Sequence, residues 1–161
     1  MNKYLPVVGI LRFSFFGKSD LQQKHSHENA INDVYNQNRM ENRFWYFERI
    51  TLPSLINQSD QDFKLIIISS LIMPEIYRER LLRIVENIPQ IQVIFAESNK
   101  LERELNPVLI DLCKASETGL VNTFRLDDDD GVSTNYVARL KETVVPRDRT
   151  IVTFPRTLCA F

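Results

Sequence analysis

The chain has 161 residues, of which 43% are hydrophobic and 25% charged, a composition typical of a soluble globular domain. Its formal net charge of -1 excludes a global field that draws it to nucleic acid or to an anionic membrane. The longest apolar run, residues 65–73, is too short to span a bilayer. Cys113 and Cys159 lack metal-type spacing, as free thiols in a reducing compartment do. We therefore expect a single domain over residues 1–161, cytoplasmic and at most peripheral to the inner face of the membrane.

The first third of the chain predicts a buried strand, a loop and a helix. Residues 4–13 are an apolar run of strand type, and the polar stretch 14–26 reads as a loop. Helical periodicity follows over residues 38–50, where the spacing predicts one buried face formed by Met40, Phe44, Phe47 and Ile50. We expect Pro53 to break this helix and restart it, because proline disfavours a helical predecessor.

The middle of the chain continues the alternation of strands and helices. Residues 62–68 form a β-branched run typical of a central parallel strand, and 91–95 predict a third strand. Between them, Pro74 suits the first position of a helix. A short helical segment over 101–105 is expected to stop before Asn106, which then caps a new helix with Pro107 at its first position and Gly119 near its end.

Four consecutive aspartates follow the fourth predicted strand, residues 120–126. A helix capped by Ser133 and a fifth strand over 150–154 complete the pattern. Strands that alternate with helices predict an α/β/α sandwich, Rossmann-like, with a mainly parallel central sheet. Ligands of such sheets bind beyond the carboxyl ends of the strands, where both Arg12 and the aspartates fall.

The aspartate run Asp127 to Asp130 predicts a metal site that holds a diphosphate. Like charges about 5 Å apart repel by roughly 3 kcal/mol at an effective dielectric of 20, so the cluster needs arginines, water or a cation. Mg²⁺ and Mn²⁺ prefer such oxygen ligands. We expect Asp127 to lie deepest, nearest a nucleotide ribose, Asp129 to face the metal, and Asp130 to add a ligand through water. Asp128 is expected beside the cofactor, and Arg12 to contact a base or diphosphate through its planar guanidinium.

Several alternatives to this interpretation exist. The metal pair can be shifted to Asp128 and Asp130, since the spacing is the same. A phosphatase-type hydrolase with Asp128 as nucleophile matches the string Asp128-Asp129-Asp130-Gly131-Val132, although little chain follows it. The run can also be a solvated acidic turn before a helix. Arg39 and Arg43 share one helix face, for which a solvated role is the favoured reading, and Arg125 serves to offset the acidic charge.

Three strings resemble the family of putative rhamnosyl transferases, glycosyltransferases of GT-A type. They are Arg12-Phe13-Ser14-Phe15-Phe16-Gly17, residues 43–48 with Thr51-Leu52-Pro53-Ser54-Leu55 and Gln58, and Phe124-Arg125-Leu126 with the four aspartates. Residues 153–156 also fit, so the resemblance covers nearly the whole chain.

The resemblance implies a GT-A-like fold whose Asp-x-Asp motif holds a divalent metal, Mn²⁺ or Mg²⁺, on a nucleotide-diphosphate sugar. Asp127 and Asp129 match that motif, and Arg12 with its following loop is implied to lie by the nucleotide. The activity implied is transfer of a sugar to a saccharide or other hydroxyl acceptor. Relatives continue past this length, so we expect the N-terminal, donor-binding part, with an exposed sheet edge and self-association. A non-catalytic nucleotide- or metal-binding remnant is the alternative, and no catalytic base is identified.

Overall fold

A computed structural model describes residues 5–17, 27–97 and 99–143 of the chain. Its centre is a four-stranded sheet in the order β3-β2-β1-β4. The strands are β1 (Val7–Arg12), β2 (Lys64–Ser70), β3 (Ile91–Ala96) and β4 (Asn122–Asp127), and all neighbouring pairs are parallel. The predicted α/β fold class with a parallel sheet is confirmed. The strand predicted over 150–154 lies outside the described residues.

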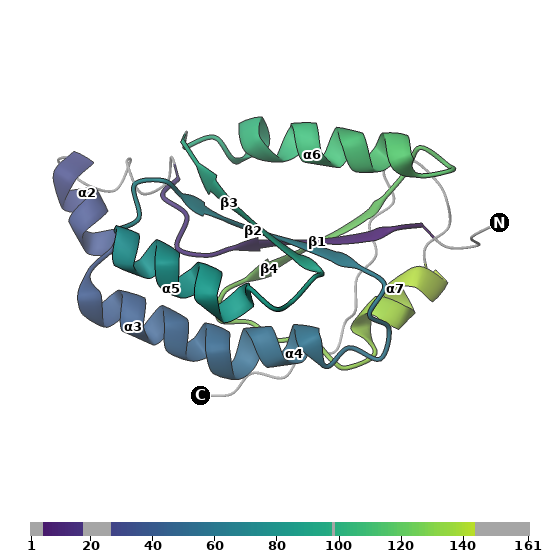
Figure 1. Ribbon diagram of the computed structural model, residues 1–161, viewed down its shortest axis with the longest axis horizontal. Helices are drawn as coiled ribbons and strands as arrows, with labels where there is room; N and C mark the ends of the chain where they lie inside the picture. Colours follow the sequence, from purple (N-terminus) through teal and green to yellow (C-terminus); the bar gives the residue numbers. More distant parts are fainter. Residues whose placement is uncertain (1–4, 18–26, 98, 144–161) are drawn as a thin grey trace.

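Helices cover both faces of the sheet (Figure 1). Among the described residues, one face carries only α6 (Leu101–Ala115), and the other carries α3 (Gln37–Tyr46), α4 (Leu52–Ile56), α5 (Glu75–Val85) and α7 (Tyr136–Thr143). Two apolar clusters match this division. The smaller packs Val8, Ile10, Ile66 and Ile68 against α6, and the larger includes Val7, Leu11, Leu65 and Ile67 on the opposite face. Successive residues of a strand point to opposite faces, so β1 and β2 contribute to both clusters.

The two central strands are apolar because both of their faces are covered. Four residues of β2, Leu65 to Ile68, are at most 1% exposed. Gly9 in β1 makes room for a neighbour, since a Cβ added there lies 2.5 Å from Phe124 Cζ and 2.7 Å from Leu65 Cδ1. The ring of Phe124 thus occupies the space that a larger residue at position 9 would take, which fixes β4 closely against β1.

The helix around Pro53 differs from the prediction. A π-helical turn, η1 (Phe47–Thr51), joins α3 to α4 without a break, and Leu52 before the proline stays helical at φ −61° and ψ −47°. The Leu52 N–H bonds to the carbonyl of Phe47, five residues back, and this wider turn accommodates the proline. It also changes the buried face. Thr51 is fully buried whereas Ile50, predicted in the core, is 40% exposed.

Two further helices differ from the prediction. Pro107 lies inside one continuous helix, α6, rather than at the start of a second one. Leu101, Leu105 and Leu112 pack along the same sheet face, and this burial holds the helix together across the proline. A helix that was not predicted, α2 (His27–Val34), lies directly before α3. Its buried Ala30 and Val34 are four residues apart, a short periodicity that could have revealed it.

Candidate nucleotide-diphosphate site

A cleft of about 610 Å³ opens where the carboxyl ends of β1 and β4 meet the start of α6. Arg12 at the end of β1 pairs in register with Asp127 at the end of β4. Parallel pairing therefore brings together two residues 115 positions apart, as the strand-end prediction required. The charged side chains that line the cleft are Arg12, Arg39, Arg43, Lys100, Arg125, Glu102 and the three aspartates Asp127 to Asp129.

Arg12 holds the first aspartate of the run. Its Nη2 donates to Asp127 Oδ1 at 2.9 Å, and its Nε donates to the same oxygen at 3.3 Å. The two side chains are 43% and 52% exposed, so solvent weakens the attraction between them. Both side chains line the cleft and remain accessible to a ligand.

Asp128, not Asp127, is the most buried of the four aspartates. It is 3% exposed, because the alternation of β4 turns the residue after Asp127 toward the interior. Its Oδ1 accepts from Arg43 Nη1 at 2.5 Å and its Oδ2 from the backbone N–H of Ser14 at 3.1 Å. Its carbonyl accepts from Oγ1 of Thr51, the last residue of the π-helical turn, at 2.9 Å. Thr51 was not predicted from the sequence to be part of the site.

Burial and charge act in opposite directions in this network. Burial is the largest influence on Asp128 and raises the pKa of its carboxyl, although Arg43 and the Ser14 N–H lower it. Burial also opposes the charge on Arg43, but the carboxylates of Asp128 and Asp129 outweigh it and raise the pKa of the guanidinium. Arg43 is thus a fixed cation that keeps a buried carboxyl in place.

Arg43 also holds the next aspartate. Its Nη1 donates to Asp129 Oδ2 at 2.7 Å, and the Asp129 side chain is 42% exposed in the cleft. Asp130 is exposed and is not among the residues that line the cleft. Burial, and then the charges of Asp129 and Asp127, raise the pKa of Asp130. Of the predicted pairs, Asp127 and Asp129 are therefore the two that share the cleft with exposed carboxylates.

Arg39 and Arg125 line the cleft, although a solvated helix face and charge neutralisation were the roles predicted for them. Neither forms an ion pair with any of the residues that the structure describes. Arg39 lies one helical turn before Arg43 on α3, and Arg125 pairs in register with Ile10 of β1. The cleft thus contains guanidinium groups beyond those that its carboxylates use.

The carboxylates of the cleft are too few to coordinate a hard divalent cation without ligands from another molecule. No group of three or more histidine, cysteine, aspartate or glutamate side chains converges among residues 5–17, 27–97 and 99–143. Two exposed aspartates, Asp127 and Asp129, do share the cleft, each with one oxygen paired to an arginine. Mg²⁺ is commonly bound through one or two carboxylates with phosphate oxygens and water. The site therefore fits a cation that binds together with a phosphate ligand.

Comparison with known proteins identifies the family. A family model described as putative rhamnosyl transferase matches residues 6–159 of the chain. The chain belongs to this family. The suspected resemblance is thereby confirmed, and the match includes Arg12 and all four aspartates. The family name is that of a glycosyltransferase, which implies a nucleotide-sugar donor and an acceptor.

Two further findings concern this member of the rhamnosyl transferase family. No curated protein matches the chain. Among the described residues, every helix is either too short or too polar to cross a bilayer.

Proposed function

We propose that the chain is the donor-binding part of a metal-dependent glycosyltransferase, which moves a sugar from a nucleotide diphosphate to a hydroxyl acceptor. The observation that carries the proposal is the cleft at the carboxyl ends of β1 and β4, where exposed carboxylates and arginines meet. Parallel α/β sheets bind ligands at this edge. The family name supports a sugar, rhamnose in particular, as the group transferred.

Asp127 and Asp129 are the proposed metal ligands, with diphosphate oxygens and water completing the coordination. A bound Mn²⁺ or Mg²⁺ supplies positive charge that stabilises the departing nucleotide diphosphate. Arg12 and Arg43 each hold one oxygen of these carboxylates and thereby orient them toward the cleft. Asp130 lies outside the cleft lining, which leaves it a role through water.

In the reaction, the acceptor oxygen bonds to the anomeric carbon while the bond from that carbon to the phosphate oxygen breaks. The nucleotide diphosphate leaves with the electron pair, and the acceptor proton goes to a base or to water. The cleft arginines stabilise the negative charge that develops on the leaving phosphate, which is the main way proteins accelerate such transfers. These residues serve the donor side of the reaction.

Asp128 has the properties of a supporting residue rather than a nucleophile. Its Oδ1 is bound by Arg43 and its Oδ2 by the Ser14 N–H, and the side chain is 4% exposed. A phosphatase nucleophile needs an accessible oxygen for attack on phosphorus. The geometry therefore favours the glycosyltransferase over the hydrolase. The closest rival is a module that binds the nucleotide without transferring the sugar.

Calorimetric titration of UDP, GDP and dTDP, with and without Mn²⁺, tests the donor site directly. We expect one nucleotide to bind in the presence of Mn²⁺ and Asp129→Ala to lose at least about tenfold in affinity, because a metal ligand is removed. Asp111→Ala is the matched control, since Asp111 is an exposed aspartate on α6 outside this cleft. Absence of binding for all three nucleotides under both conditions would refute the donor site. Transfer to added sugar acceptors then separates the enzyme from the binding module.

A further inference from the structure

Ser14, the second residue after β1, has a hydroxyl that nothing in the described structure uses. The residue lines the cleft and is 8% exposed. Its Oγ is buried and has no hydrogen-bond partner among the described residues. A buried polar atom without a partner costs roughly 1–3 kcal/mol, so proteins seldom keep one without a use.

The backbone of Ser14 is also strained. Its φ of 43° lies in the left-handed region, and Ser14 is the only non-glycine residue of the described chain with a positive φ. Serine has a Cβ that disfavours this conformation, whereas glycine adopts it freely. Two contacts hold it there. Its N–H donates to Asp128 Oδ2 at 3.1 Å, and its carbonyl accepts from Tyr35 Oη at 3.2 Å. Both backbone polar groups of Ser14 are thus hydrogen-bonded, whereas its hydroxyl has no partner among the described residues.

The cleft that Ser14 lines carries five basic side chains and four acidic ones, so positive charge is in slight excess. Arg39 and Arg125 line the same cleft without an ion pair to a described residue. The first turn of α6 also borders the cleft through Leu101 and Glu102, and a helix N-terminus favours anions. A neutral hydroxyl donor in such a place is suited to an anionic oxygen with several lone pairs. Phosphoryl oxygens are of this kind.

We propose that Ser14 Oγ donates a hydrogen bond to a phosphoryl oxygen of the nucleoside diphosphate, so that Ser14 is a substrate-binding residue of the donor site. The inference rests on the proposed function and adds a residue to it. Because Asp128 and Tyr35 hold the strained backbone, Cβ of Ser14 has a fixed position before the ligand arrives. Such pre-organisation reduces the entropy lost on binding.

Two substitutions of Ser14 separate the effect of its hydroxyl on binding from the effect of its backbone strain on stability. Ser14→Ala removes the hydroxyl and keeps the Cβ in the left-handed region, whereas Ser14→Gly removes both. We expect both variants to bind the preferred nucleoside diphosphate about tenfold or more weakly, the usual loss for a hydrogen bond to a charged group. Their melting temperatures differ, with Ser14→Gly the more stable. Equal losses of affinity in variants of different stability identify the hydroxyl as the cause.

Competition experiments assign the ligand group that the hydroxyl binds. Inorganic pyrophosphate and the matching free nucleoside are titrated against bound nucleoside diphosphate in the wild type and both variants. We expect the substitutions to weaken competition by pyrophosphate and to leave competition by the nucleoside unchanged. Ser69→Ala is the control, because Ser69 is fully buried, contacts Met73 and lies outside the cleft lining.

The outcomes distinguish this inference from the proposed function. If the wild type binds a nucleoside diphosphate and both Ser14 variants bind it equally well, the inference is overturned and the proposed function stands. Weaker competition by the free nucleoside would show that the hydroxyl contacts the sugar or base, and the phosphoryl assignment would be wrong. If the wild type binds no nucleotide, both proposals fail together.

Discussion

Two clusters in the described part of the chain place one cation between two aspartates, and they lie at opposite ends of the sheet. At the carboxyl end of β4, Arg43 contacts Asp128 and Asp129 at 2.5 and 2.7 Å. Before the amino end of β2, Lys141 of α7 contacts Asp60 and Asp62 at 2.9 and 3.0 Å. The distances are alike, but the surroundings differ.

The Lys141 cluster is an anchor, and the Arg43 cluster is part of a larger site. Lys141 is 8% exposed and joins α7 to the segment that leads into β2, and it does not line the cleft beside Arg43. Beside Arg43 lie an exposed carboxylate, guanidinium groups that form no ion pair with a described residue, and the Ser14 hydroxyl, which has no hydrogen-bond partner among those residues. The comparison teaches that a bridged aspartate pair alone does not indicate function. Polar groups left without partners nearby are the informative feature.

The largest effect is expected from Arg43→Met, which leaves Asp128 buried without its cation. Breaking a buried pair in this way is expected to lower the free energy of unfolding by about 3 kcal/mol. Arg43 lowers the pKa of Asp128, so its removal raises that pKa further. When a carboxyl has a higher pKa in the folded state than in the unfolded state, the free energy of unfolding falls as the pH rises toward the folded-state pKa. Urea denaturation should therefore show a larger defect at pH 8 than at pH 5.

The double variant Arg43→Met with Asp128→Asn provides the control for that experiment. Neutral asparagine removes the uncompensated charge, so we expect part of the lost stability to return and the pH dependence of the defect to disappear. A single variant as stable as the wild type at pH 8 would show that Arg43 does not compensate Asp128.

A smaller effect is expected from Lys141→Met, about 1–2 kcal/mol in the free energy of unfolding, since Asp62 is exposed and only Asp60 is partly buried. The hydrogen bond from Lys141 overcomes the effect of burial and lowers the pKa of Asp60, so this stability disappears as the pH falls below about 4. Burial opposes the charge of Lys141, but its aspartate partners raise its pKa, so the stability also disappears above about pH 10.

Urea denaturation curves recorded between about pH 4 and about pH 10 measure how much Lys141 contributes to the free energy of unfolding. Nucleotide titration of the same variant then tests whether this cluster affects binding. We expect Lys141→Met to bind nucleotide as tightly as the wild type. A loss of nucleotide affinity without loss of stability would contradict the assignment of this cluster as an anchor.

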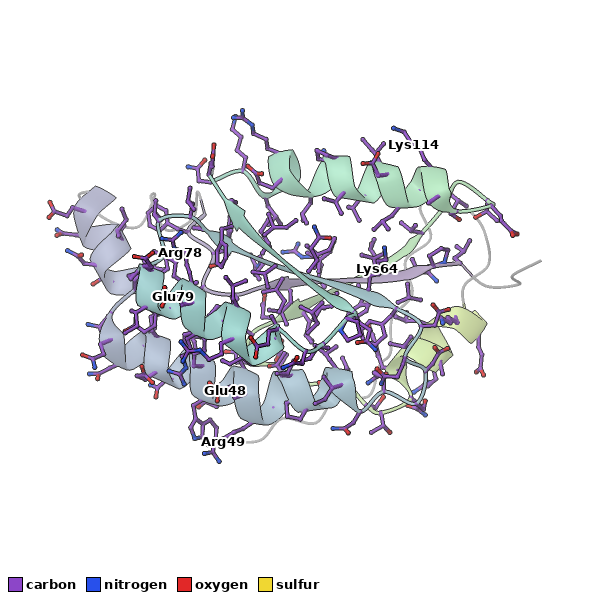
Figure 2. All side chains as sticks on the ribbon, in the orientation of Figure 1. Glu48, Arg49, Lys64, Arg78, Glu79 and Lys114 are labelled. Atoms are coloured by element: carbon purple, nitrogen blue, oxygen red, sulfur yellow. The ribbon has the colours of Figure 1, made fainter. Side chains whose placement is uncertain are left out.

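The smallest effect is expected on nucleotide affinity, and it should distinguish two arginines of one helical segment. Arg39 lines the cleft, whereas Arg49 in η1 points away from the sheet (Figure 2) and stacks over Trp45 at 5.3 Å. Arg39→Gln is expected to weaken nucleotide binding about fivefold, since one cation near the diphosphate is lost, with little change in stability. Arg49→Gln should leave the affinity unchanged. Equal affinities in both variants, measured by calorimetry, would remove Arg39 from the donor site.

Much of the fold follows from local patterns in the sequence. The apolar runs of all four described strands were predicted, and the aspartates were placed correctly at the carboxyl end of β4. The errors at Pro53 and Pro107 have one physical cause, because both prolines lie in helices whose apolar faces pack on the sheet. Tertiary burial outweighs the local cost of a missing N–H donor.

The sequence by itself determined the alternation of strands and helices, the strand-end position of Arg12 and the aspartates, and the family. Those features depend on short-range periodicity and on motifs that are contiguous in the chain. Only the tertiary structure decided which aspartate is buried, which arginines line the cleft and which serine hydroxyl lacks a partner among the described residues. These depend on contacts such as those of Asp128 with Ser14 and Arg43, which are 114 and 85 positions away in the chain and adjacent only after folding.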